Sequence, residues 1–84
     1  MKINPLVIYR EEFDKSAVLF RPDTGESFML NRTASFIWKQ LEQGADRAGI
    51  LQALAEACGE LPPSAEKDLD QFLARLQAGG YLAE

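Results

Sequence analysis

The side chains that could do chemistry in this sequence are few and widely spaced. The 84 residues include one cysteine, Cys58, and no histidine. The thiol of Cys58 is the candidate nucleophile, but histidine, the commonest general base that would activate it, is missing. Cys58 falls on the apolar side of a predicted helix, where a thiol behaves as a small hydrophobic group, and we expect it in the core. One thiol without an imidazole cannot form a four-ligand zinc site. We therefore predict no catalytic residue, no metal site and no cofactor.

Two groups of carboxylates are the remaining candidates for acid–base chemistry. Glu11, Glu12 and Asp14 lie in a predicted connection, without the apolar surroundings that raise the pKa of a carboxyl group. Asp68 and Asp70 are two residues apart in a predicted helix, so they point to different sides of it. We expect both groups to be solvated surface rather than a catalytic pair.

The charge of the chain narrows the classes of partner. Thirteen acidic against nine scattered basic residues give a net charge of −4, whereas nucleic acids and anionic membranes bind clustered lysine and arginine. The apolar run Leu6 to Tyr9 is too short for a signal peptide, and no run approaches the ~20 apolar residues of a membrane span. A lone cysteine agrees with a reducing compartment. We expect a cytoplasmic protein with no nucleic-acid or membrane partner.

Three short runs of β-branched and aromatic residues predict strands in a chain whose size fits a single domain over residues 1 to 84. The first two, Leu6 to Tyr9 and Ala17 to Phe20, flank a polar segment. Pro and Gly within Arg21 to Gly25 predict a turn, so the third run, Glu26 to Leu30, should return antiparallel to the second. These short connections predict a meander with the second strand at the centre and the third at a sheet edge, unless the first strand inserts between them.

Three helices are predicted to follow the strands. Their expected N-caps are Asn31, Asp46 and Ser64, and their expected stops are Gly44, Gly59 and Gly79 with Gly80. Trp38 lies at helical spacing with other apolar residues, so we expect it to anchor the core. Tyr81 and Leu82 should fold back onto that core.

One ordered set of residues spans nearly the whole chain. It comprises Leu30-Asn31-Arg32-Thr33-Ala34, Ile37-Trp38, Gly44, Ile50 to Leu54, Asp68-Leu69, Phe72-Leu73, Leu76 and Gly80-Tyr81-Leu82. In order and spacing this set resembles the PqqD-like family. The resemblance implies an α+β, winged-helix-like fold, a three-stranded antiparallel sheet followed by three helices. It also implies a non-catalytic recognition element that binds the leader of a ribosomally made precursor peptide. That peptide would be presented to a modifying enzyme of the radical S-adenosylmethionine type, in pyrroloquinoline quinone or related biosynthesis.

A binding site follows from the edge strand. An edge has unpaired main-chain groups, so an extended peptide can add a strand there while pockets select its side chains. The predicted binding residues are Ser27, Phe28, Met29, Leu30, Asp68, Phe72, Arg75 and Leu76. The first four supply the pairing edge, Phe72 and Leu76 receive an apolar leader side chain, and Arg75 or Asp68 pairs with a leader charge. The acidic connection or the second helix could dock the partner enzyme.

Two alternatives share this pattern of strands and helices. A winged-helix DNA reader needs a basic recognition helix, yet residues 46 to 60 contain Arg47 as the one cation. A structural subunit of a larger complex would differ by binding no leader peptide. Exposed strand edges can also pair with each other, so both a monomer and a homodimer are compatible with the sequence.

Overall fold

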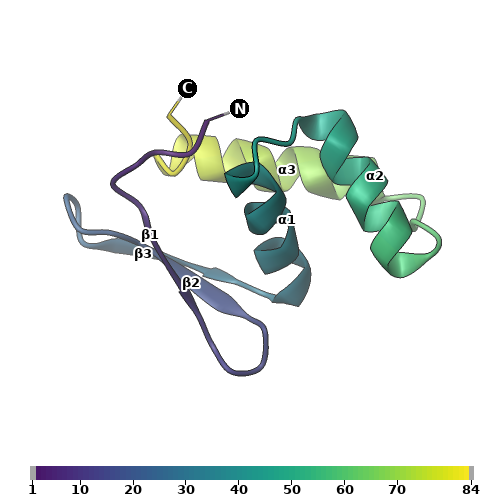
Figure 1. Ribbon diagram of the computed structural model, residues 1–84. Helices are drawn as coiled ribbons and strands as arrows, with labels where there is room; N and C mark the ends of the chain where they lie inside the picture. Colours follow the sequence, from purple (N-terminus) through teal and green to yellow (C-terminus); the bar gives the residue numbers. More distant parts are fainter. Residues whose placement is uncertain (1, 84) are drawn as a thin grey trace.

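Three antiparallel strands precede three helices in the computed structural model, which describes residues 2–83. The strands are β1 (Ile8–Glu11), β2 (Ala17–Arg21) and β3 (Glu26–Leu30), and the helices are α1 (Arg32–Glu42), α2 (Arg47–Cys58) and α3 (Ala65–Ala78). The helices lie above the sheet in Figure 1, with α2 beyond its end. The predicted α+β architecture and element order are confirmed.

The sheet has the order β1-β2-β3, so the predicted edge position of β3 is also confirmed. Both neighbours of β2 are antiparallel to it, and Leu19 at its centre pairs with Tyr9 of β1 and Phe28 of β3. Because side chains alternate along a strand, these three residues share the face that is covered by the helices. Met29 lies on the opposite face and is 78% exposed.

The first strand begins later than predicted, at Ile8 rather than Leu6. The side-chain oxygen of Asn4 accepts a hydrogen bond from the Leu6 amide at 3.0 Å, and its carbonyl accepts one from the Val7 amide at 3.1 Å. These bonds form a turn around Pro5, which takes the main chain of this segment away from β2. The apolar pattern alone contains no signal of that turn.

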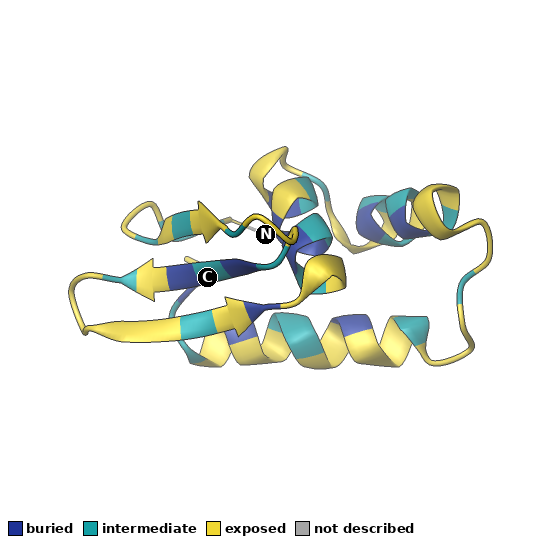
Figure 2. Cartoon of the chain, turned by 90° about the horizontal axis from the view of Figure 1, so that it is seen from below, coloured by how far each residue is buried: buried dark blue, intermediate teal, exposed yellow. Residues whose placement is uncertain are grey.

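The core lies between the inner face of the sheet and the facing sides of the helices. Its largest fully buried side chains are Trp38, Leu19, Leu30, Ile50, Leu69 and Leu76. In Figure 2 the buried residues concentrate in β2 and on the inward sides of the helices. Trp38 is 1% exposed, as expected of a core anchor, and its indole nitrogen has no hydrogen-bond partner among residues 2–83.

The three predicted N-cap residues are confirmed in position, and two of them make a capping hydrogen bond. The side chain of Asn31 accepts a hydrogen bond from the Ala34 amide at 2.8 Å, and that of Asp46 accepts one from the Gly49 amide at 2.8 Å. Ser64 is the N-cap residue of α3 as predicted, but its hydroxyl donates to the Asp68 carboxylate at 3.0 Å and its side chain makes no capping bond. The main chain of Ser64 has a ψ of 0°, whereas Asn31 and Asp46 have the extended conformation that is usual for an N-cap whose side chain accepts from the first amides.

The segments that lead to the two ends of the chain are paired with each other (Figure 1). Ile3 and Leu82 form an isolated antiparallel bridge, and the Asn4 side chain donates to the Gly80 carbonyl at 2.9 Å. Tyr81 is 3% exposed, which confirms that the residues after α3 fold back onto the core. Within residues 2–83, no helix has the length and apolar character needed to cross a membrane.

Candidate functional site

The free edge of the sheet lies beside the last helix, and α3 runs along β3 in Figure 2. The Phe28 ring of β3 meets the Phe72 ring of α3 edge-on, with ring centres 6.1 Å apart. It meets the Tyr81 ring in the same way at 5.6 Å. The guanidinium of Arg75 covers Phe28 at 5.3 Å from the ring centre. Together these side chains fill the space between β3 and α3 next to Phe28.

The four predicted edge residues differ in what their side chains can reach. Ser27 and Met29 are exposed on the outer face of the sheet, away from α3. Phe28 is half-buried on the inner face, and Leu30 is buried in the core. What the four residues share is a main chain at the free edge of a strand, where alternate peptide groups have no partner in the sheet.

A groove opens where β3 ends and α1 begins. It has a volume of about 480 Å³ and is bounded by the first turns of α1, the last turns of α2, the connection to α3 and the first half of α3. We name it the α1–α3 groove. Its polar lining residues are Asn31, Thr33 and Asp68, and most of the others, such as Phe72, are apolar. A concave apolar surface with a few polar groups at defined positions is typical of a ligand site.

The structure brings only part of the predicted α3 set into this groove. Asp68 and Phe72 line it, whereas Arg75 lies against Phe28 beyond its end. Leu76 has no exposed surface and belongs to the core, so the predicted direct contact with a peptide does not fit its position. Leu76 lies one helical turn beyond Phe72, outside the lining of the groove.

The contributions of α1, α2 and the Leu61-Pro62 connection to the groove were not predicted. Thr33 and Leu61 lie in its lining although neither has a pattern typical of a binding residue. The sequence contained one signal. Leu61 precedes two prolines and must be extended, so its apolar side chain has no place on the apolar face of a helix and has to find other contacts. The spacing of residues within one helix does not indicate which other helix faces it.

The prediction that Cys58 lies in the core is wrong, because its side chain is exposed. Only Ile50 and Leu54 of α2 are buried, so the last turn of this helix extends past the sheet and the other helices. Cys58 lines the rim of the α1–α3 groove and also that of a second groove. Helical periodicity predicted its direction correctly but not the distance over which the core continues.

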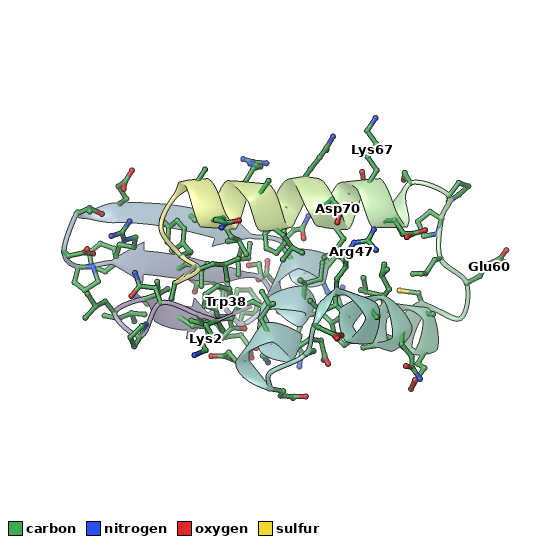
Figure 3. The ribbon with its side chains drawn as sticks, turned by 90° about the horizontal axis from the view of Figure 1, so that it is seen from above. Lys2, Trp38, Arg47, Glu60, Lys67 and Asp70 are labelled. Atoms are coloured by element: carbon green, nitrogen blue, oxygen red, sulfur yellow. The ribbon has the colours of Figure 1, made fainter. Side chains whose placement is uncertain are left out.

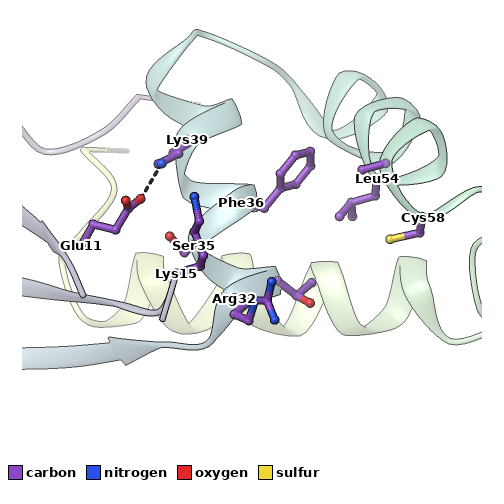
Figure 4. Close-up of a pocket in the computed structure, with 10 residues that line it drawn as sticks. Glu11, Lys15, Arg32, Ser35, Phe36, Lys39, Leu54 and Cys58 are labelled. Atoms are coloured by element: carbon purple, nitrogen blue, oxygen red, sulfur yellow. Dashed lines mark hydrogen bonds and ion pairs between the residues drawn. The ribbon is translucent and has the colours of Figure 1, made fainter. Parts of the chain in front are cut away.

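The second groove has a volume of about 400 Å³ and lies between the β1–β2 hairpin, α1 and the end of α2. We name it the hairpin groove (Figure 4). Glu11, predicted in a connection, is instead the last residue of β1, and it forms an ion pair with Lys39 of α1 at 2.5 Å. Hydrogen bonds from Lys39 and from the Tyr9 hydroxyl hold the pKa of Glu11 below its usual value. An ionised, solvated carboxylate fits the expectation that this acid is not catalytic.

The last two helices are joined by a polar contact at their surface. The guanidinium of Arg47 binds the Asp70 carboxylate at 2.7 Å and the Glu66 carboxylate at 3.2 Å. In Figure 3 the side chains of Arg47 and Asp70 point toward each other across α2 and α3. These bonds lower the pKa of Asp70. Within residues 2–83, no three acidic, cysteine or histidine side chains gather as they would around a metal ion.

Known proteins provide two comparisons for this arrangement. Residues 16–82 match the family model described as coenzyme PQQ synthesis protein D, PqqD. A solved structure described as "TbiB1 in Complex with the TbiA(beta) Leader Peptide" is 32% identical, with a TM-score of 0.86 over 99% of this chain and 95% of that one. Among curated proteins the chain has no match. Because the family model covers most of the sequence, including β2, β3 and all three helices, this chain belongs to the PqqD family.

Proposed function

We propose that this chain binds the leader of a ribosomally made precursor peptide along the free edge of β3, and that it does so without catalysing a reaction. The observation that carries the proposal is the position of the α1–α3 groove, whose lining begins at Asn31, directly after β3 ends. A peptide added to the edge gains main-chain hydrogen bonds there, and its next side chains reach the groove. The leader peptide bound by the TbiB1 neighbour supports this proposal.

The proposed roles of the residues follow from their positions. Ser27 to Leu30 offer the main-chain groups of the edge, and Phe72 receives an apolar leader side chain at the groove wall. Asp68 lies on the same wall, with one carboxylate oxygen bound to the Ser64 hydroxyl and the other free to pair with a leader cation. Arg75, held over Phe28, is placed to pair with a leader carboxylate further along the edge.

The winged-helix DNA reader is not supported by the family match or by the leader-peptide neighbour. The surface of α2 argues against it as well. Arg47 is the one cation of α2, and its guanidinium is already bound to Asp70 and Glu66. Binding to a duplex requires several cations that are free to displace counterions from phosphates.

The test is an amide-shift titration of the labelled protein with synthetic peptides encoded by the short reading frames beside its gene. We expect one peptide to shift the amides of Ser27 to Leu30 together with those of Thr33 and Phe72. Phe72→Ala should weaken that peptide at least tenfold, because an apolar wall is lost, whereas Phe13→Ala in the exposed β1–β2 turn should not. Shifts that leave β3 unchanged would contradict strand addition.

Methylation of single peptide nitrogens tests the binding mode more directly. Each methyl group removes one main-chain donor from the leader and leaves its side chains intact. In an added strand every second amide points toward the edge, so the loss of affinity should alternate along the peptide with a period of two. A helical leader uses its amides within the helix, so methylation would weaken binding at nearly every interior position, without a period of two.

Presentation of the leader to a modifying enzyme, of the radical S-adenosylmethionine type, is part of the same proposal. The acidic β1–β2 connection or α2 would dock that enzyme. Cys58, free and exposed, suits a reducing compartment, so we place the protein in the cytoplasm. With the edge of β3 unoccupied, a monomer and a homodimer are both compatible with the fold. In a reconstitution with the neighbouring enzyme, the precursor should change mass only when this chain is present.

A further inference from the structure

The hairpin groove gathers positive charge in an acidic protein. Lys15 of the β1–β2 turn, Arg32 and Lys39 line it, although the chain as a whole has a net charge of −4. Figure 4 shows these three basic side chains on one side of the groove. Phe36 of α1 points from among them toward Leu54 of α2, which lies on the opposite side. Glu11 lies beside Lys39 on the same side, so that side has three cations and one carboxylate, and the opposite side is apolar.

Two of these cations have no acidic partner of their own. Lys39 is bound to Glu11, but neither Lys15 nor Arg32 forms an ion pair with any of residues 2–83. Arg32 acts at a distance on Asp14, which is occupied with the hydroxyl and amide of Ser16, and Lys15 acts in the same way on Glu11, which is bound to Lys39. The charge of Arg32 contributes only a small part of the lowering of the Asp14 pKa, after the Ser16 hydrogen bonds. A carboxylate from another molecule would find two available cations here.

The positions of these cations are unfavourable for the isolated fold. Arg32 is the first residue of α1, where a positive charge opposes the helix dipole. Lys15 has a φ of +74°, a left-handed conformation that lysine rarely adopts. Neither cost is offset by an ion pair among the described residues, which favours a role for both side chains in binding.

The hairpin groove continues the α1–α3 groove. Thr33, Leu54 and Cys58 line both, so the two depressions meet along one border. A peptide that leaves the edge of β3 at Leu30 crosses the α1–α3 groove first and reaches Lys15 and Arg32 next. The same extended chain can therefore occupy both grooves.

We propose that the hairpin groove is a second binding subsite for the leader peptide. It binds two neighbouring leader residues, one acidic and one apolar, in the flank of the peptide that continues past Leu30 at the end of β3. This inference rests on the proposed function. The leader carboxylate pairs with Arg32 and Lys15, and the neighbouring apolar side chain packs against Phe36 and Leu54. Because the groove is open to solvent, the cations contribute to specificity more than to total affinity.

The first experiment measures the affinity of the leader peptide that shifts the amides of Ser27 to Leu30 in the titration. Arg32→Gln and Lys15→Asn should each weaken it about two- to fivefold, as expected for exposed ion pairs. Asparagine is chosen because it tolerates a positive φ. Arg10→Gln, on the outer face of the sheet, removes the same charge and should leave the affinity unchanged. Replacing the acid of the flank by its amide should abolish the difference between Arg32→Gln and the wild type.

The second experiment does not depend on the leader. Cys58 is the one cysteine of the chain and lies at the border of the grooves, so its reaction with disulfides reports on the charge there. The measured quantity is the rate with the anionic reagent dithiobisnitrobenzoate divided by the rate with neutral dithiodipyridine. We expect this ratio to fall about two- to fivefold below the wild-type value in Arg32→Gln and to stay unchanged in Arg10→Gln.

The outcomes separate the two proposals. If no peptide binds but Arg32→Gln still changes the ratio of the two reagents, the leader function fails although the groove attracts anions. A leader that binds at β3 supports the edge site. If Arg32→Gln and Arg10→Gln then give the same leader affinity and the same ratio of reagent rates, the second subsite is refuted. An effect of Arg32→Gln that persists when the flank acid is neutralised also refutes the subsite.

Discussion

The guanidinium of Arg75 lies over the ring of Phe28, 5.3 Å from the ring centre, and joins α3 to the free edge strand of the sheet. The same ring is held edge-on by Phe72 and Tyr81. A cation over an aromatic face at an exposed site is attracted to the ring by about 0.5–1 kcal/mol, which favours this rotamer of Arg75 over others. The favoured rotamer holds the guanidinium where an added strand would pass, and this lowers the entropy cost of pairing with a charged leader residue.

Replacing Arg75 with glutamine should lower the free energy of unfolding by about 0.5–1 kcal/mol, because the contact with the Phe28 ring is lost. Urea denaturation at constant pH measures this change. Lys67→Gln is the matched control, since Lys67 is on the same helix and points into solvent in Figure 3. Equal effects of the two substitutions would show that the ring contact adds no stability.

The ion pair between Arg47 and Asp70 predicts a pH effect of defined sign. A hydrogen bond from Arg47 holds the pKa of Asp70 below its usual value in the folded protein. Its contribution to stability is therefore complete above the unfolded pKa of about 3.9 and is lost as the pH falls through the lower folded pKa. Arg47→Gln should raise the pKa of Asp70 toward its usual value in a carboxyl NMR titration, and Arg10→Gln should not. An unchanged Asp70 would mean that the pair does not persist in solution.

Local patterns predicted those parts of the molecule that depend on near neighbours. Alternation along β3 puts Phe28 and Leu30 on one face and Met29 on the other, and in the structure the first face is the inner one. The side chains of Asn31 and Asp46 cap their helices because an N-cap needs only an acceptor and amides two or three residues further on. Strand order followed from short connections.

Contacts between distant segments could not be predicted in the same way. The bridge between Ile3 and Leu82 joins opposite ends of the chain, and nothing in either segment specifies the other. Cys58 continues the apolar stripe of α2, yet the stripe extends past the core and leaves the thiol exposed. Both grooves depend on where α2 lies relative to α1, which is a property of packing rather than of periodicity. The site was therefore anticipated along β3 and α3 and missed along α1 and α2.

Gly80 should be among the residues least tolerant of substitution. Its φ is +79°, and a β-carbon there would overlap the guanidinium of Arg21. That guanidinium is fixed by bonds to the Gly79 carbonyl and to Asp23, each at 2.7 Å, so it cannot move aside without losing them. Gly80→Ala should cost about 2–3 kcal/mol of unfolding free energy, the sum of left-handed strain and of these bonds. Gly59→Ala, at φ +81° in open space, should cost only about 1 kcal/mol.

A hydrogen-bonded chain of three side chains connects β1 to α1. The Tyr9 hydroxyl donates to the Glu11 carboxylate at 3.2 Å and lies 2.7 Å from the hydroxyl of Ser35, which is 3% exposed. Since the phenol has one proton and gives it to Glu11, Ser35 is the donor in the second bond. Removing the phenol oxygen therefore leaves a buried serine without this acceptor.

Tyr9→Phe should accordingly cost about 1–2 kcal/mol in free energy of unfolding, and Ser35→Ala about 1 kcal/mol. The double variant should lose less than the sum by at least about 0.5 kcal/mol, because the second substitution removes a group that the first has already left unpaired. Tyr9→Phe should also raise the pKa of Glu11, which loses one of the hydrogen bonds that lower it, while Lys39 still holds that pKa below its usual value. Strictly additive losses, together with an unchanged Glu11 titration, would show that Tyr9 stabilises β1 through its ring alone.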